Sequence, residues 1–202
     1  MLRHSFLVPP ILCAFVLSAA FVMAHAQTTP PADTKPVDAK LADTKLALNA
    51  ALVLTPEFCA TKTKMKNEHQ TLETGKVACA ELEEPLKGVF SSVTRVAAAS
   101  SPGEAQVVLL PRLVDVDAAM TMGYGNREMV VLLEWTVKDM AGKTVWIETV
   151  QGSAQHHLGN MATYGKNLKL ILNDSVKDAA KQSASKMSAS PELRKLSAAP
   201  VK

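Results

Sequence analysis

The chain has 202 residues, of which 48% are apolar and only 4% aromatic, and its formal net charge is +3. An intrinsically disordered chain would hold fewer apolar residues and more net charge, and a collagen-like chain would need far more than 9 Gly and 11 Pro. With 22 basic against 19 acidic residues, the chain also lacks the basic excess that is typical of nucleic-acid-binding proteins.

Residues 1–26 have the features of a cleavable secretory signal peptide. An almost wholly apolar run over residues 6–23 ends at Ala24-His25-Ala26, which supplies the small residues of a cleavage site. An uncleaved anchor is the alternative, but the run of 18 residues is barely long enough to span a bilayer. Lipidation at Cys13 is a second alternative, which the residues before this cysteine do not favour. We therefore expect export to the periplasm, and association with the outer membrane stays open.

A flexible tether is predicted over residues 27–45, where Thr, Pro, Ala, Asp and Lys predominate and can bury little surface. A single folded domain should follow over residues 46–196, with a disordered tail over residues 197–202. Cys59 and Cys79 remain after cleavage, and in an oxidising compartment such a pair favours a disulfide. Two buried free thiols are the alternative.

The first half of the domain is predicted to hold a strand, a helix and a second strand. An apolar strand is expected over residues 50–59, with Pro56 at an edge or a bulge. After a polar loop or short strand, apolar side chains at helical spacing predict a helix from Thr71 to Val93. Pro85 either kinks this helix or starts a second one. A turn and a strand over residues 105–117 follow.

A β-hairpin is the clearest pattern in the sequence, with strands over residues 128–138 and 143–155. Apolar residues alternate with polar ones on both sides of a short turn, which is typical of half-buried strands. Asp139 and Gly142 occupy the first and fourth positions of a type I turn, and a left-handed Gly142 would add a G1 bulge.

The register that follows from this turn pairs Trp135 with Ile147 on the core face of the hairpin. It pairs Thr136 with Trp146 on the outer face. A loop of two or four residues would mix apolar and charged side chains on each face, because a slip of one residue turns every side chain over. The apolar face therefore favours the bulged register.

A long helix is predicted from Thr163 to Met187, and a terminal turn follows from Pro191 to Leu196. The order of elements is then β-α-β-β-β-α. This order indicates an α+β two-layer sandwich, in which two helices cover one face of a mostly antiparallel sheet. The strands on either side of the first helix are expected to pair in parallel.

Element order and the hairpin carry a resemblance to known families; the hairpin reads Leu-Leu-Glu-Trp-Thr-Val-Lys-Asp at 132–139 and Gly-Lys-Thr-Val-Trp at 142–146. Together with the signal peptide and the Pro-containing tether, they resemble small periplasmic domains of bacterial envelope assembly factors. The nearest are the LptE-like lipopolysaccharide-assembly lipoproteins, followed by the amino-terminal domains of TolB-like and curli-secretion (CsgG-like) proteins. The resemblance implies an α+β domain that assists envelope assembly. The chain departs from the LptE-like pattern because it lacks a lipobox, and no site residue is carried over.

No catalytic, metal or cofactor site is predicted from the sequence. His156 and His157 are adjacent on a strand, so they point to opposite faces and do not converge on one ion. Asp115 and Asp117 share a face of their strand, but no nucleophile or histidine accompanies them. Residues 123–125 (Gly-Tyr-Gly) lack the third glycine and the following helix of a dinucleotide-binding loop.

The outer face of the hairpin is the candidate contact surface. Leu132, Trp146 and Val150 are expected there without helix cover, and exposed apolar patches often mark partner sites. Routine cross-strand packing is the alternative interpretation. Tyr124, on a glycine-flanked loop, is a fourth candidate contact.

We therefore expect a non-enzymatic binding or assembly module that contacts a protein of the bacterial envelope and needs no cofactor. No nucleic-acid partner is expected, and the oligomeric state stays open. The first alternative is a periplasmic carrier that holds a lipid, a lipopolysaccharide or another amphiphile between sheet and helices. The second is a small exported hydrolase whose site would be built from loops.

Overall fold

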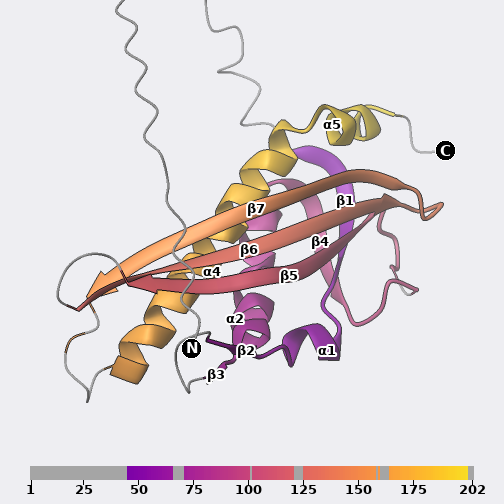
Figure 1. Cartoon of the computed structure of the whole chain (residues 1–202). Coiled ribbons are helices and arrows are strands. Elements are labelled where there is room, and N and C mark those ends of the chain that lie inside the picture. The colour runs from indigo at the N-terminus through magenta and orange to yellow at the C-terminus, as the bar shows by residue number, and fades with distance from the viewer. Residues whose placement is uncertain are drawn as a thin grey trace, which may run out of the picture. The chain divides into compact units, whose positions relative to one another are not determined.

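A five-stranded mixed sheet is the framework of the domain, and its strands follow the order β4-β1-β5-β6-β7 (Figure 1). The computed structural model describes residues 45–65, 71–100, 102–120, 125–157, 159 and 164–199. The predicted signal peptide, nearly all of the predicted tether and Tyr124 therefore lie outside the described residues. The strands of the sheet are β1 (Leu46–Val53), β4 (Phe90–Val96), β5 (Val107–Met120), β6 (Asn126–Asp139) and β7 (Thr144–His157).

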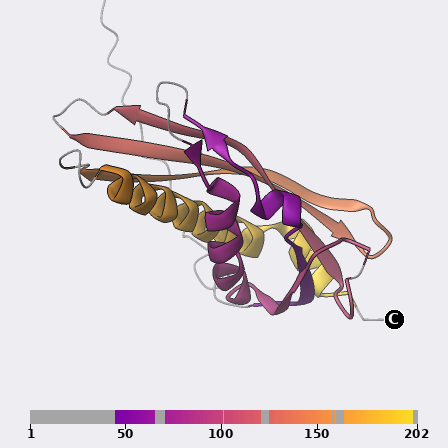
Figure 2. The same ribbon diagram turned by 90° about the horizontal axis from the view of Figure 1, so that it is seen from below.

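The helices lie on one face of this sheet, and α4 runs along the long strands with α2 beside it (Figure 2). Two short strands, β2 and β3, pair with each other as an antiparallel ribbon. These elements are α1 (Pro56–Cys59), β2 (Thr63–Lys64), β3 (Thr71–Leu72), α2 (Thr74–Glu81), α3 (Glu83–Lys87), α4 (Tyr164–Ala189) and α5 (Pro191–Ser197).

β1 lies at the centre of the parallel part of the sheet. Its residue Ala50 is level with Val93 of β4 on one side and with Val107 of β5 on the other. The three long strands β5, β6 and β7 pair antiparallel. The predicted α+β class and the parallel pairing of β1 with β5 are therefore confirmed. The sheet is mixed, however, and β4 is a strand that the predicted order lacks.

The predicted helix from Thr71 to Val93 is wrong as a single element. It contains α2, then α3 with Pro85 in its first turn, and then β4, so Pro85 belongs to a second helix. The chain leaves α3 at Gly88 and becomes a strand over the run Ser-Ser-Val-Thr at 91–94. Hydroxyl and β-branched side chains suit an edge strand, and pairing with β1 outweighs the helical spacing of the apolar residues.

The predicted strand over residues 50–59 begins and ends too late. β1 stops at Val53, and the following residues start α1. Thr55 Oγ1 accepts a hydrogen bond from the Phe58 N–H at 3.1 Å, which caps the helix. Pro56 occupies the first turn, where its missing N–H leaves no hydrogen bond unmade. Pro56 therefore marks a helix start and not a strand edge.

The predicted long helix is confirmed as α4, and its packing against β6 and β7 closes the core. Trp135 is fully buried, as predicted, and its indole N–H donates a 2.8 Å hydrogen bond to Ser183 Oγ. Gly152 lets the helix approach, because a Cβ atom there would lie 2.2 Å from Ala179 N and 2.3 Å from the Ser175 carbonyl oxygen. At this crossing, sheet and helix leave no space for the amphiphile that the carrier alternative places between them.

Candidate functional site

The turn of the hairpin forms as predicted. Asp139 N–H donates to the Lys143 carbonyl oxygen at 2.9 Å, and Gly142 N–H donates to the Asp139 carbonyl oxygen at 3.0 Å. Gly142 has a φ of +80°, the left-handed conformation that a G1 bulge requires. Asp139 Oδ1 also accepts hydrogen bonds from the N–H groups of Ala141 and Lys143, both at 2.9 Å. The local sequence is therefore sufficient to predict this turn.

A β-bulge at Val145 shifts the register beyond the turn. Lys138 pairs with Thr144, but Val137 pairs with Trp146, so Val145 is an extra residue in β7. Every predicted pair beyond the bulge is wrong by one residue. Since side chains alternate along a strand, this shift turns the rest of β7 over.

The shift exchanges the two faces of β7. Trp146 and Val150, expected on the outer face, lie on the helix-covered face, where Val150 is fully buried opposite Leu133 and Trp146 packs against the core. Ile147, expected in the core, lies on the outer face with 59% of its surface exposed. Of the expected contact residues in the described structure, Leu132 is the one on the outer face, where it is half-buried.

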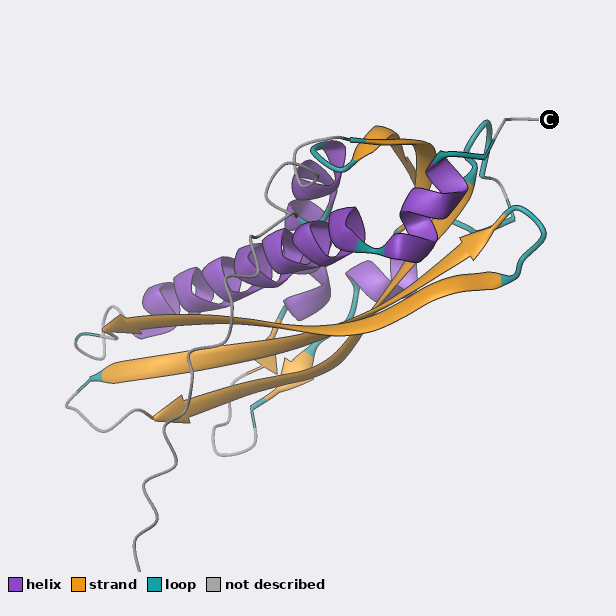
Figure 3. Cartoon of the chain, turned by 90° about the horizontal axis from the view of Figure 1, so that it is seen from above, coloured by secondary structure: helices purple, strands orange, loops and turns teal. Residues whose placement is uncertain are grey.

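The outer face of β5, β6 and β7 has no described helix over it, and we call it the open face (Figure 3). Val114 lies at a second bulge, in β5, and is 43% exposed beside this face. The open face mixes aliphatic side chains with charged and uncharged polar ones. Its residues include Leu110, Arg112, Asp115 and Asp117 of β5, Val130, Leu132, Glu134 and Thr136 of β6, and Ile147, Thr149 and Gln151 of β7.

An ion pair lies in the middle of the open face. Arg112 Nε and Nη2 donate to the two Glu134 carboxylate oxygens at 2.9 and 3.0 Å, from facing positions on β5 and β6. These hydrogen bonds lower the pKa of Glu134 and raise the pKa of Arg112. A forked pair of this kind fixes the direction of both side chains and neutralises their charges. The pair itself therefore carries no net charge, whereas Asp115, opposite Leu132, adds an exposed carboxylate to the same face.

Sequence reasoning missed both the ion pair and the exposed isoleucine. The opposite charges of Arg112 and Glu134 were a usable signal, but the segment that connects β5 to β6 does not indicate their register. The exposure of Ile147 follows from the bulge at Val145, and neither bulge has a glycine that would mark it.

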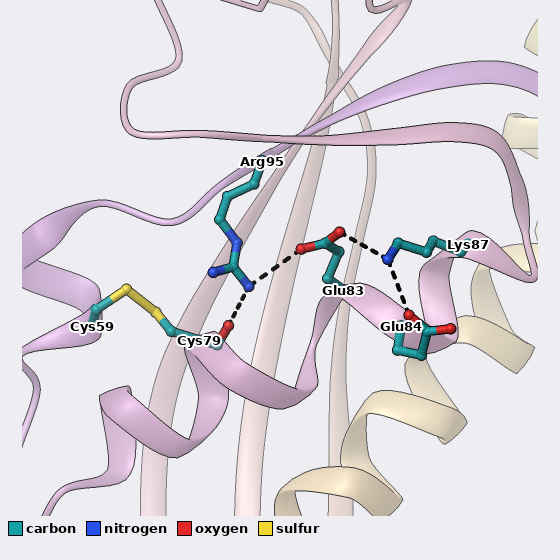
Figure 4. Close-up of polar contacts among 6 residues, drawn as sticks. All are labelled: Cys59, Cys79, Glu83, Glu84, Lys87 and Arg95. Atoms are coloured by element: carbon teal, nitrogen blue, oxygen red, sulfur yellow. Dashed lines mark hydrogen bonds and ion pairs between the residues drawn. A yellow bond between two sulfur atoms is a disulfide. The ribbon is translucent and has the colours of Figure 1, made fainter.

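The predicted cysteine pair forms a disulfide that joins α1 to α2 (Figure 4). Arg95 of β4 lies against the second cysteine: its Nη2 donates to the Cys79 carbonyl oxygen and lies 3.3 Å from Glu83 Oε2. Lys87 Nζ lies 3.0 Å from the other oxygen of Glu83. These contacts hold α2 and α3 against the edge strand β4, so this cluster supports the fold.

The two adjacent histidines do not converge on one site. His156 Nε2 lies 2.8 Å from Asp174 Oδ2, whereas His157 Nδ1 lies 3.1 Å from Asn126 Oδ1 on the opposite face of the strand. Among the described residues, no group of three His, Cys, Asp or Glu side chains is placed to hold a metal ion. No helix in the described part of the chain is both long and apolar enough to cross a membrane.

Comparison with known proteins finds relatives of the fold but not of the sequence. No family model and no curated protein matches the chain. A DUF330 protein from Xanthomonas campestris is similar with a TM-score of 0.52 at 7% identity, over 73% of this chain and 88% of that one. A minor lipoprotein from Acinetobacter baumannii has a TM-score of 0.44 at 13% identity, over 72% and 94%. Lipoprotein B from Nitrosomonas europaea has a TM-score of 0.42 at 11% identity, over 72% and 85%. The chain thus shares its fold with the Xanthomonas protein.

Proposed function

We propose that the protein is a non-enzymatic binding module of the bacterial cell envelope, which contacts an envelope protein through the open face. The observation that carries this proposal is the exposed Ile147, which lies on a helix-free surface opposite Thr136 and beside the central ion pair. When a partner covers a large aliphatic side chain, the complex is stabilised by about 25 cal/mol for each Å² of apolar surface that is buried.

Placement in the envelope rests on two features of the chain. Residues 1–26 have the features of a signal peptide, which directs a protein out of the cytoplasm. The disulfide between Cys59 and Cys79 is typical of proteins that fold in an oxidising compartment. Both features favour the periplasm as the place where the open face meets its partner.

The open face suits a partner whose own surface is moderately apolar where it covers Ile147, Leu132 and the ion pair. Arg112 and Glu134 satisfy each other, so a partner can cover them without supplying a countercharge. Around them, Thr136, Thr149 and Gln151 offer further hydrogen-bonding groups. We infer an interface with the paired charges at its middle and the aliphatic side chains of Ile147 and Leu132 on either side of them.

The variant Ile147→Asp tests this proposal, because it would bury an unpaired carboxylate at the centre of the contact. The full chain, expressed in its own cells, is crosslinked there and purified, and the attached envelope proteins are identified by mass spectrometry. We expect Ile147→Asp to lose a protein that the unmodified chain captures.

Leu170→Asp is the matched control, since Leu170 is also aliphatic and 45% exposed but lies on α4. It should retain the captured protein. If Ile147→Asp keeps every crosslinked envelope protein, the open face is not the contact surface. Equal loss in both variants would also contradict the proposal, because it would show that the capture does not depend on this face.

A further inference from the structure

We infer that a cleft between α2 and α4 binds an anionic single-chain amphiphile, a ligand with one apolar chain and one negatively charged headgroup. The cleft lies outside the open face, so this inference does not depend on the proposed protein contact. Its volume is 530 Å³, within the range of about 300–1,000 Å³ that is typical of small-molecule sites. Its apolar walls are Leu72, Val77, Ala80 and Leu172, and its charged lining residues are Glu73, Lys76 and Lys169.

The apolar part of the cleft comes from three elements that converge on one side of the domain. Leu72 of β3 and Leu172 of α4 are buried and also belong to the core. Val77 and Ala80 of α2 are more exposed and form the adjoining wall. A hydrocarbon chain in the cleft would contact these side chains and extend the apolar packing of the core outwards.

The charged part of the cleft is basic at α4. Lys169 is exposed and forms no ion pair among the residues that the structure describes. Lys76, on α2, lies 3.6 Å from Glu73 Oε2, and both of these side chains are well exposed. Lys166, one turn before Lys169, adds a second exposed ammonium to the same region of α4. Glu73 lines the same cleft and is paired with Lys76, so an anionic headgroup at Lys169 would meet the positive charge that the lining has in excess.

The combination of these two parts identifies the class of ligand. A purely apolar ligand would make no use of the ammonium of Lys169, and a small anion would make no use of the apolar wall of Val77 and Ala80. An amphiphile with one chain satisfies both parts at once. The sequence-based alternative places an amphiphile between the sheet and the helices, but Gly152 brings the sheet and α4 into close contact there. The cleft between α2 and α4 is a different position for such a ligand.

Isothermal titration calorimetry tests the inference. The protein without residues 1–26 is titrated with dodecanoate below its micelle concentration. Dodecyl maltoside, which has a chain of the same length and an uncharged headgroup, is titrated in parallel. We expect saturable binding of dodecanoate with one ligand per chain, and weaker binding of the maltoside. The variant Lys169→Glu should weaken dodecanoate binding about tenfold or more, because it places a like charge beside the headgroup.

Lys181→Glu is the matched control, since it makes the same charge change at an exposed position of α4 away from the cleft. It should leave the affinity within about twofold. Ala80→Phe, which fills the cleft, should weaken the binding of both ligands. The inference is overturned if dodecanoate does not saturate, if the maltoside binds as tightly, or if Lys181→Glu weakens binding as much as Lys169→Glu. Circular dichroism confirms that each variant is folded.

Discussion

Gly152 is the residue on which the close contact between β7 and α4 depends. A Cβ atom at this position would overlap the backbone of α4 at Ser175 and Ala179, which cannot rotate away as a side chain can. We predict that Gly152→Ala lowers the free energy of unfolding by about 1–3 kcal/mol, as overpacking of a core does. Urea denaturation followed by tryptophan fluorescence measures this change.

Gly165 provides the matched control for this prediction. It lies in the first turn of α4, and a Cβ atom there meets nothing within 4 Å. Gly165→Ala should therefore raise the stability slightly, by up to about 1 kcal/mol, because alanine is the better helix former. If Gly152→Ala proves as harmless as Gly165→Ala, the helix and the strand are not in close contact at this point.

Glu134 is the residue whose charge responds to pH on the open face. The hydrogen bond from Arg112 lowers its pKa, so the folded value lies below the unfolded one. The pair therefore stabilises the fold at pH values above the unfolded pKa, and this stabilisation is lost as the pH falls through the folded pKa. Because Glu134 is half-buried but Arg112 is well exposed to solvent, the effect on stability should be small.

Carbon-13 NMR of the Glu134 carboxyl measures its pKa directly. In the variant Arg112→Gln, which removes the charge but keeps a polar side chain, we predict that the pKa rises towards the ordinary value of a glutamate. An unchanged pKa in this variant would show that Arg112 does not hold the carboxylate in solution.

At the scale of elements, the hairpin shows how far local sequence determines structure. The turn depends on Asp139 and Gly142, which are neighbours in the chain, and it was predictable from these two residues. The bulge at Val145 depends on how β7 fits α4 and the core, which no short segment encodes. For this reason the predicted register puts Trp135 on the correct face of the hairpin, but it puts Ile147 and Trp146 each on the wrong face.

The starts of α1 and α5 share a local signal, which was used in the prediction at Pro191 but not at Pro56. Ser190 caps α5, and its Oγ accepts a hydrogen bond from the Leu193 N–H at 3.3 Å. The same pattern of hydroxyl residue, proline and glutamate begins α1 at Thr55. A backbone N–H and the Thr55 hydroxyl lower the pKa of Glu57, and the Ser190 hydroxyl and a backbone N–H lower the pKa of Glu192. The strand assigned across Pro56 was therefore avoidable by reasoning from capping alone.

The disulfide carries a prediction at the scale of elements, because it joins α1 to α2 and leaves the sheet unlinked. The two cysteines are 20 residues apart, and the loss of a link of this length costs roughly 3 kcal/mol by chain-entropy reasoning. We predict that the double variant Cys59→Ala/Cys79→Ala unfolds at lower urea concentration but keeps its strand signal in circular dichroism. An unchanged midpoint would contradict a stabilising role for the link.

At the scale of the whole molecule, the α+β class and the long carboxyl-terminal helix were predictable because periodic patterns of apolar residues extend over many positions there. The strand β4 was not, because its seven residues include only three apolar ones and its stability comes from pairing with β1. The outer face of the hairpin was predictable as a surface without helix cover, but which residues of β7 lie on it was not. Their positions depend on register between strands, and register is a property of the assembled sheet.

The central claim is that the open face, and not the helical side, meets an envelope protein. A photo-crosslinking amino acid placed at position 147 or 149 of the open face, or at position 181 of α4, tests it most directly in living cells. We predict that positions 147 and 149 both crosslink to the same envelope protein, and that position 181 does not. Crosslinks to that protein from position 181 alone, or equally from all three positions, would contradict the claim.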